Sequence, residues 1–258
     1  MSNHLLFAVE NHVATLTINR PERRNAISLE MISLFHHHLD QAQADPTIKV
    51  LCLSAAGSHV FCAGADLGAE LLDAEKTGPS GPEKYAALLK RMLVFPKPTV
   101  AKVNAPCLAG GLGLMLACDI IIASEAAFFQ TPEINVGIFP YMVGALLAQN
   151  VPWKTTLDMA LTGKKIAAQE AERLGLVSRC VKPEQLDQEV DKVLTGLCQK
   201  SPLGLKMGKE AFMHMKEMPV NEGLDYLCQA LLSAVKTKDA REGMLAFLQK
   251  RSPKFTGE

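Results

Sequence analysis

The chain has 258 residues, 48% hydrophobic and 21% charged, and its 27 basic and 27 acidic side chains leave no formal net charge. This length supports one sizeable core, or a core with an appended helical piece. Without a long basic stripe, we expect no nucleic-acid partner. No apolar run approaches the length of a membrane span, so we expect no membrane association either.

The cysteines and the N-terminal residues indicate the cellular compartment in which the protein is expected. Seven cysteines show no CxxC pair, their number is odd, and several lie in apolar runs, which predicts buried free thiols in a reducing environment. The first residues lack the charged-then-apolar pattern of a signal peptide. We therefore expect a cytoplasmic protein.

The first part of the chain alternates strand-like and helix-like segments. Two short strands at 5–9 and 13–18 predict a hairpin. Ser28 is expected to cap a helix that runs to about Ala44. There follow a strand at 49–54, a Gly- and Pro-rich loop at 76–82, a helix at 83–95, a strand at 99–103, a helix ending near 117, and strands at 119–123 and 128–129. This alternation predicts an α/β core.

After about residue 140 the pattern becomes mostly helical. Helices are expected near 141–149, 153–161, 168–174, 184–199, 203–217, 220–236 and 239–249. A soft boundary falls at 195–200, with Lys200–Pro202 as the hinge. We therefore predict two domains, a core at 1–197 that holds the site and a helical region at 198–258.

Two glycine-bearing turns carry the strongest chemical signal. The first, Phe61–Leu67, and the second, Asn104–Gly113, each follow an apolar strand and lead into a segment of helical character. Glycine permits close backbone approach, so two such turns can aim two N–H groups at one point, as an oxyanion hole requires. The helix that begins at Gly110 or Gly111 would add its positive N-terminal end. Either turn alone is more typical of tight strand–helix packing.

Glu133 is the candidate acid/base residue. It follows Pro132 in a predicted loop after the 128–129 strand, and its neighbours Ile134, Val136 and Ile138 are apolar. A carboxylate in such surroundings loses solvation, which raises its pKa towards neutrality. The alternative is a glutamate that starts a helix or lies exposed on a loop.

The two glycine turns and the segment around Glu133 resemble the enoyl-CoA hydratase/isomerase (crotonase) superfamily, and the resemblance extends over about residues 7–250. It is also carried by Asn19–Ser28, Leu114–Ser124, Thr131–Pro140 and Ala171–Val177. The resemblance implies a spiral of ββα units with a helical C-terminal region that forms a homotrimer or a dimer of trimers. It implies an acyl-CoA substrate whose thioester enolate is held by the N–H groups of Ala65 and Gly110. Coenzyme A would enter as part of the substrate, with no permanently bound cofactor.

One position departs from that resemblance. Hydratases of the superfamily use two glutamates; Glu133 matches the second, and Gly113 stands at the position of the first. A single carboxylate suffices to move a double bond by carrying a proton from C2 to C4 of a 3-enoyl thioester. Hydration and isomerisation both stay open. So do thioester hydrolysis, decarboxylation and a non-catalytic acyl-CoA-binding role.

The resemblance also implies residues that contact the substrate or its CoA part: Arg23, Arg24, Ala26, Ala63, Asp66, Leu67, Gly111, Tyr141, Phe247 and Lys250. The last two would reach the CoA of a neighbouring subunit, or else belong to a solvated helix end. Tyr141 could instead be a packed aromatic, and Asp66 a helix cap. We expect no metal site, because His36–His38 are consecutive on a helix and point about 100° apart.

Overall fold

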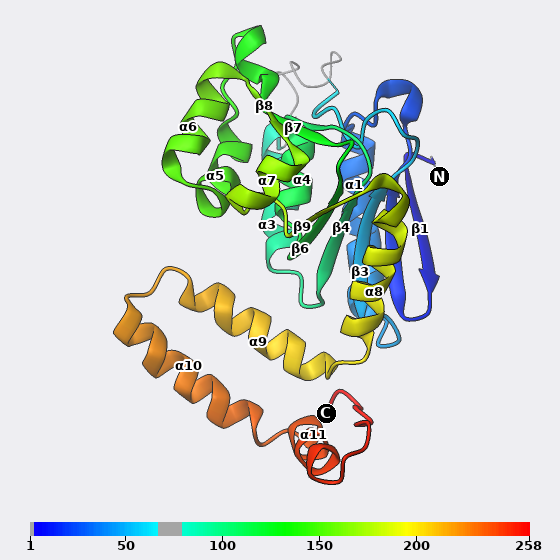
Figure 1. Cartoon of the computed structure of the whole chain (residues 1–258), viewed down its shortest axis with the longest axis vertical. Coiled ribbons are helices and arrows are strands. Elements are labelled where there is room, and N and C mark those ends of the chain that lie inside the picture. Colours follow the sequence, from blue (N-terminus) through cyan, green and yellow to red (C-terminus); the bar gives the residue numbers. More distant parts are fainter. Residues whose placement is uncertain (1–2, 67–78) are drawn as a thin grey trace.

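The computed structural model describes residues 3–66 and 79–258, whose strands form two sheets (Figure 1). The larger has the order β1-β2-β3-β4-β6-β9, with bounds Leu5–Glu10, Val13–Ile18, Val50–Ala55, Thr99–Val103, Ile120–Ser124 and Arg179–Val181. Strands β1 and β2 form the predicted antiparallel hairpin, with Leu5 opposite Ile18. Each later pair in this sheet is parallel.

The smaller sheet has the order β5-β7-β8, formed by Cys107–Leu108, Phe128–Gln130 and Lys165–Ala167. An isolated bridge between Cys62 and Cys107 links the first glycine turn to it. Strands β4 and β5 precede α4 (Gly110–Leu116), and β6 and β7 precede α5 (Tyr141–Asn150). These two ββα units confirm the predicted α/β spiral.

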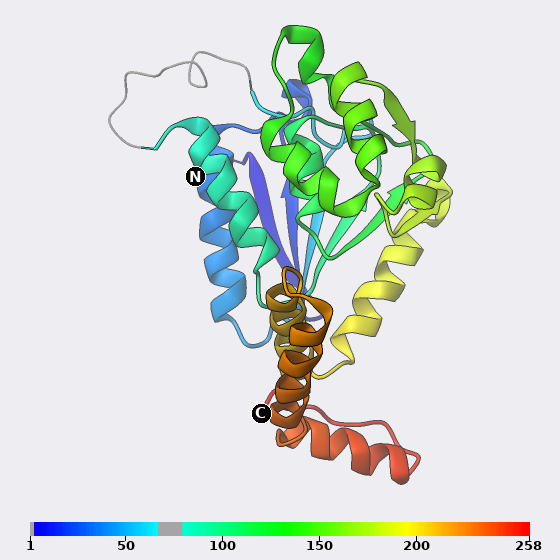
Figure 2. The same ribbon diagram turned by 90° about the vertical axis from the view of Figure 1, so that its left-hand side faces the viewer.

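Helices cover both faces of the large sheet (Figure 2). Helices α1 (Leu29–Ala44) and α3 (Gly81–Leu93) pack against each other on one face, and α8 (Leu186–Cys198) contacts β3, β4 and β6 on the other. In β3, Leu51 and Leu53 join the α1–α3 cluster, while Val50 and Cys52 join the α8 cluster. Burial on both faces is expected for a parallel strand and explains its continuous apolar run.

The helix starts follow from capping. Ser28 accepts a hydrogen bond from the Met31 N–H, 3.2 Å away, as the sequence predicts. Helix α3 begins at Gly81, two residues earlier than expected, because Ser80 and Glu83 form a reciprocal capping box. A cap of this kind satisfies N–H groups that the first helical turn leaves without partners.

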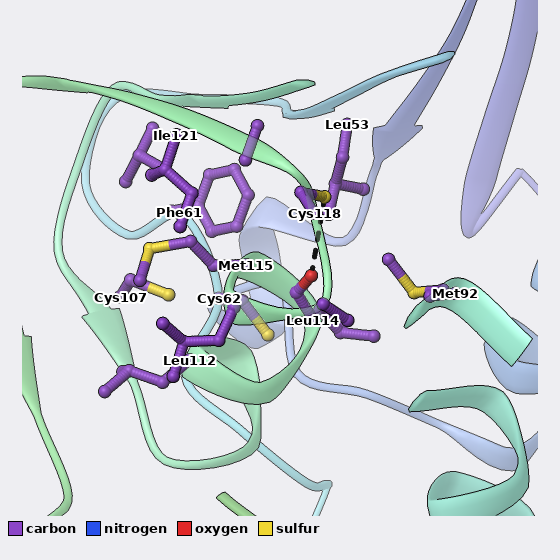
Figure 3. Close-up of a cluster of buried hydrophobic side chains, with 14 of the residues drawn as sticks. Leu53, Phe61, Cys62, Met92, Cys107, Leu112, Leu114, Met115, Cys118 and Ile121 are labelled. Carbon is purple, nitrogen blue, oxygen red and sulfur yellow. Dashed lines mark hydrogen bonds between the residues drawn. The ribbon is translucent and has the colours of Figure 1, made fainter. Parts of the chain in front are cut away.

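The centre of the core lies around the two glycine turns and α4 (Figure 3). Leu53, Phe61, Met115 and Ile121 are buried there, together with the thiols of Cys62, Cys107 and Cys118. Burial raises the pKa of Cys62 to about 12, so this thiol stays protonated at neutral pH. All seven cysteines are free, but the predicted burial holds for only four of them, because Cys180 and Cys198 are half-buried and Cys228 is exposed.

The remaining helices are α6 (Trp153–Thr162), α7 (Ala168–Leu174), α9 (Pro202–Met215), α10 (Val220–Ala234) and α11 (Lys238–Leu248), with 3-10 turns at Pro21–Arg23, Pro132–Val136 and Pro183–Gln185. Helices α9 to α11 extend away from the sheets (Figure 1). At the predicted hinge, the Ser201 hydroxyl donates to buried Asp239, 2.6 Å away. Within the described part of the chain, every helix lacks the length or apolar character that crossing a bilayer requires.

Candidate active site

The first glycine turn presents the N–H of Ala65 through a short parallel bridge to Ile27. The Ile27 N–H donates to the Gly64 carbonyl oxygen, and the Asp66 N–H donates to the Ile27 carbonyl oxygen, at 2.8 and 2.9 Å. In a parallel bridge the residue between these two bonds turns its own N–H away from the partner strand. The Ala65 N–H therefore faces the side opposite Ile27.

The second turn meets the first at this point. Gly64 has φ +96°, and a Cβ atom added to it would lie 2.6 Å from the Ala109 Cβ and 3.1 Å from the Gly110 nitrogen. A Cβ added to Gly110 would lie 3.6 Å from the Ala65 nitrogen. Ala109 itself has φ +48°, which is unusual for a residue with a side chain. The close approach of these turns requires glycine at position 64.

Both candidate donors lack an acceptor within the part of the chain that the structure describes. Across residues 3–66 and 79–258, neither the Ala65 N–H nor the Gly110 N–H forms a hydrogen bond. Gly110 opens α4, where first-turn N–H groups have no intrahelical acceptor and the helix dipole is positive. Two adjacent free amides at such a place can stabilise a developing negative oxygen.

Ala65 and Gly110 line a cavity of about 410 Å³, a size typical of small-molecule sites. Its apolar wall includes Ile27, Met142 and Tyr85. Its polar wall is formed by His4, Arg20, Arg23, Ser28, Glu30 and Asp66. The cavity is therefore lined by the paired amides together with both apolar and charged side chains.

Glu133 lies on the 3-10 turn Pro132–Val136 rather than on an open loop. Buried Thr131 anchors the start of this turn by donating to the Met159 carbonyl oxygen of α6, 2.9 Å away. The Glu133 Oε2 atom is buried without a hydrogen-bond partner among the described residues. Desolvation raises the pKa of Glu133, outweighing the bond from its own N–H. A carboxyl group with an unpaired oxygen and a raised pKa is suited to exchange a proton with a bound substrate.

Glu133 is not among the residues that line the 410 Å³ cavity, but it lies close enough to act electrostatically on Tyr85, which does line it. Tyr85 in α3 is buried, and its hydroxyl donates to the Gly110 carbonyl oxygen. Tyr85 is a site residue that was not predicted from the sequence. The available signal was a hydroxyl-bearing aromatic on the same helical stripe as Leu88 and Met92.

Arg20 is a second cavity residue that the sequence analysis missed, although it lies within the Asn19–Ser28 motif. It is buried, and it donates to Asp66 Oδ2 at 3.0 Å and to the Ala26 carbonyl oxygen at 2.6 Å. Arg23 donates to Asp66 Oδ1 at 3.3 Å. Desolvation opposes ionisation of Asp66, but these two arginines outweigh it and lower its pKa. Asp66 is thus held as an ion-paired carboxylate.

Replacing Arg20 by methionine is expected to lower the free energy of unfolding by about 2–4 kcal/mol, because it leaves a half-buried carboxylate with one weaker partner. Urea denaturation monitored by circular dichroism measures this change. Arg23→Met is the matched control: its side chain is 60% exposed, so a loss below about 1 kcal/mol is expected. Equal losses in both variants would contradict a special role for Arg20.

The other predicted substrate contacts lie in different places. Ala26 and Gly111 are buried, and a Cβ on Gly111 would lie 2.7 Å from the Cys62 carbonyl oxygen, so this glycine allows close packing of the two turns. Ala63 pairs with the carbonyl oxygen of exposed Arg24. None of these four residues lines the cavity. Leu67 lies outside the described residues.

Three predicted residues are exposed and are not among those that line the cavity. Tyr141 begins α5, and 76% of its surface is accessible. Phe247, with 83% accessible, and Lys250 lie in and just after α11, which Figure 1 places at the opposite end of the chain from α5 and α6. Their predicted contact with the CoA of a neighbouring subunit stays a prediction.

The two ββα units and the helical C-terminal region define a crotonase-type α/β fold. A family model described as enoyl-CoA hydratase/isomerase matches residues 8–258. The chain is 36% identical over 259 residues to 2,3-dehydroadipyl-CoA hydratase of Escherichia coli, covering 99% of each. It also aligns with human enoyl Coenzyme A hydratase domain-containing protein 3, with a TM-score of 0.91 and 29% identity over 98% of this chain and 100% of the other.

A second solved structure is also similar to this chain. The solved enoyl-CoA hydratase of Bacillus anthracis superposes with a TM-score of 0.89 and 28% identity, covering 99% of this chain and 100% of the other. The chain belongs to the enoyl-CoA hydratase/isomerase family, whose members act on CoA thioesters.

Proposed function

We propose that this protein binds an acyl-CoA thioester and catalyses proton transfer at the carbon next to the thioester carbonyl. The observation that carries the proposal is the convergence of the Gly64–Ala65 turn on the N-terminus of α4, where two adjacent N–H groups have no acceptor among residues 3–66 and 79–258. A thioester oxygen that gains negative charge as an enolate forms would accept both. Each such donor contributes about 3–4 kcal/mol to transition-state stabilisation.

Of the reactions that share this intermediate, the site favours isomerisation of a double bond. Glu133 would take a proton from C2 of a 3-enoyl thioester, the electron pair would delocalise onto the thioester oxygen, and the same proton would return at C4 to give the conjugated 2-enoyl product. This cycle needs one carboxylate, and desolvation raises the pKa of Glu133 from its ordinary value.

Hydration of a 2-enoyl thioester is the second candidate. It is favoured by the relatives, since the matched proteins of Escherichia coli and Bacillus anthracis are called hydratases. In this chain Glu133 would have to activate the water alone, because Gly113 offers no side chain. Non-catalytic acyl-CoA binding and the other crotonase reactions follow as third alternatives.

Two substrates separate these possibilities in one absorbance assay. With 3-hexenoyl-CoA we expect absorbance of the conjugated enoyl thioester to appear, because isomerisation creates that chromophore. With crotonyl-CoA, hydration would remove the same chromophore, and we expect this rate to be at least about tenfold lower. Silence on both, combined with tight binding of the CoA esters, would overturn the enzyme proposal in favour of passive binding.

The same proposal includes a homotrimer or a dimer of trimers. In the described structure, helices α9 to α11 and the residue that follows α10 expose apolar side chains, a pattern typical of an interface between subunits. They are Phe212, Val220, Leu224, Leu231, Leu232, Val235, Met244, Leu245, Phe247 and Leu248. Assembly through these helices would bring Phe247 and Lys250 of a neighbouring subunit towards the CoA part of the substrate. Coenzyme A would enter and leave as part of the substrate and product in each turnover.

A further inference from the structure

Helix α4 begins with an unusually weak first turn. Three of its first four residues are Gly110, Gly111 and Gly113. Each glycine in a helix costs about 1 kcal/mol relative to alanine. The turn that carries the proposed Gly110 donor therefore has little intrinsic preference for one conformation. An oxyanion hole, in contrast, acts through donors that are already in place before the charge develops.

Tyr85 supplies support from outside the helix. Its hydroxyl donates to the Gly110 carbonyl oxygen, so α3 holds the first turn of α4. Desolvation, followed by the nearby thiols of Cys62 and Cys107 and the carboxyl of Glu133, raises the pKa of Tyr85 well above its ordinary value. The hydroxyl therefore keeps its proton and acts as a hydrogen-bond donor rather than as a base.

The absence of a side chain at position 113 is what admits this hydroxyl. A Cβ added to Gly113 would overlap the Tyr85 hydroxyl oxygen, and it would lie 3.2 Å from Tyr85 Cζ and 3.3 Å from Leu89 Cδ1. Any residue larger than glycine would displace Tyr85 from Gly110. Gly113 and Tyr85 thus form a complementary pair across the α3–α4 contact, beside the paired amides.

We propose that Tyr85 is a positioning residue that holds the Gly110 end of the oxyanion hole, and that Gly113 is glycine in order to admit it. This inference rests on the proposed function, because it assigns Tyr85 to the site where the enolate oxygen would lie. Tyr85 needs no contact with the reacting carbon. Its effect passes through the orientation of the α4 first turn.

Tyr85→Phe removes only the hydroxyl. We expect kcat for 3-hexenoyl-CoA to fall about 10- to 100-fold and KM to change less than about threefold, because the apolar ring still fills the cavity wall. The enolate absorbance of bound acetoacetyl-CoA gives a readout without turnover, and it should weaken in the variant. Tyr226→Phe is the control: this α10 tyrosine is separate from the cavity and should keep wild-type values.

Gly113→Ala tests the same contact from the other side. It should lower kcat and the enolate absorbance at least as much as Tyr85→Phe. The double variant should lose no more than the worse single variant, because both changes break one hydrogen bond. Gly196→Ala, on α8 with open space around the added Cβ, should have wild-type activity.

These measurements test the proposed function and the role of Tyr85 separately. Wild-type protein that neither isomerises 3-hexenoyl-CoA nor shifts acetoacetyl-CoA towards its enolate would overturn the proposed function itself. If the wild type does both, unchanged kcat and enolate absorbance in Tyr85→Phe would overturn the role of Tyr85. A fall in kcat with an equal rise in KM and a lower melting temperature would also overturn it, since that result indicates general loosening of the fold.

Discussion

Replacing Glu133 by glutamine is expected to lower kcat by about 10²–10⁴-fold while KM for the CoA ester changes less than about threefold. The amide has nearly the same shape as the carboxylate but cannot take the C2 proton, and a positioned acid/base contributes rate increases of that size. Steady-state kinetics with 3-hexenoyl-CoA and direct titration with a saturated acyl-CoA measure the two effects. Binding should survive because the residues proposed to contact CoA are other than Glu133.

The matched control is Glu125→Gln, which makes the same change on an exposed glutamate between β6 and β7. It should leave kcat and KM unchanged. Wild-type turnover in Glu133→Gln would remove Glu133 from the mechanism.

The pH dependence offers a second signature of Glu133. Because desolvation raises its pKa, the acid limb of the kcat/KM profile should lie at higher pH than an ordinary carboxyl would produce. A raised pKa also means that the folded state favours the protonated form of Glu133. The contribution of this group to folding stability is therefore lost as the pH rises through its pKa in the folded state. Glu133→Gln should therefore match or exceed the wild-type melting temperature at pH 7, and this advantage should shrink on acidification.

Gly64→Ala is expected to damage both activity and stability. The added Cβ would lie 2.6 Å from the Ala109 Cβ, and φ +96° is a conformation that alanine rarely adopts. Strain of this kind costs about 1–3 kcal/mol in unfolding free energy. Relief of the collision would separate the two turns and misplace the Ala65 N–H, so kcat should fall by about 10²–10³-fold. Urea denaturation and the isomerisation assay provide the measurements.

A suitable comparison is Gly175→Ala, since Gly175 also has positive φ (+80°) but its added Cβ would meet its nearest atom at 3.4 Å. This variant should lose about 1 kcal/mol of stability as a result of the backbone conformation, with no change in kcat. If Gly64→Ala retains wild-type kcat despite reduced stability, the convergence of the two turns is irrelevant to catalysis.

Much of the fold could be predicted because the relevant signals are local. The hairpin, the Ser28 cap and the strand at Val50–Ala55 depend on period, capping and apolar runs that the chain displays in consecutive residues. The short strands at Cys107–Leu108, Lys165–Ala167 and Arg179–Val181 were missed. They have two or three residues each, too few for a recognisable period, and they are strands only because a neighbouring segment pairs with them.

The candidate site likewise contains residues that local sequence predicts and residues whose roles depend on distant segments. Glu133 could be named because a carboxylate among apolar neighbours is visible along the chain, and Ala65 and Gly110 because the two glycine turns match the motif of the family that the chain resembles. Arg20 and Tyr85 could not, because their roles depend on partners that are 46 and 25 positions away, Asp66 and Gly110. The apolar stripe shared with Leu88 and Met92 indicates that Tyr85 is buried, but nothing along the chain indicates which carbonyl group its hydroxyl meets or which carboxylate pairs with Arg20.

The sequence by itself determined the fold class, the family resemblance, the two glycine turns and the single carboxylate, since each depends on residue types at short spacing. The tertiary structure alone decided that the two turns touch at Gly64 and Ala109, and that the space at Gly113 belongs to Tyr85. The physical reason is that close packing brings together atoms from distant segments. Whether a space is empty or filled is a property of the packed core and not of any one segment.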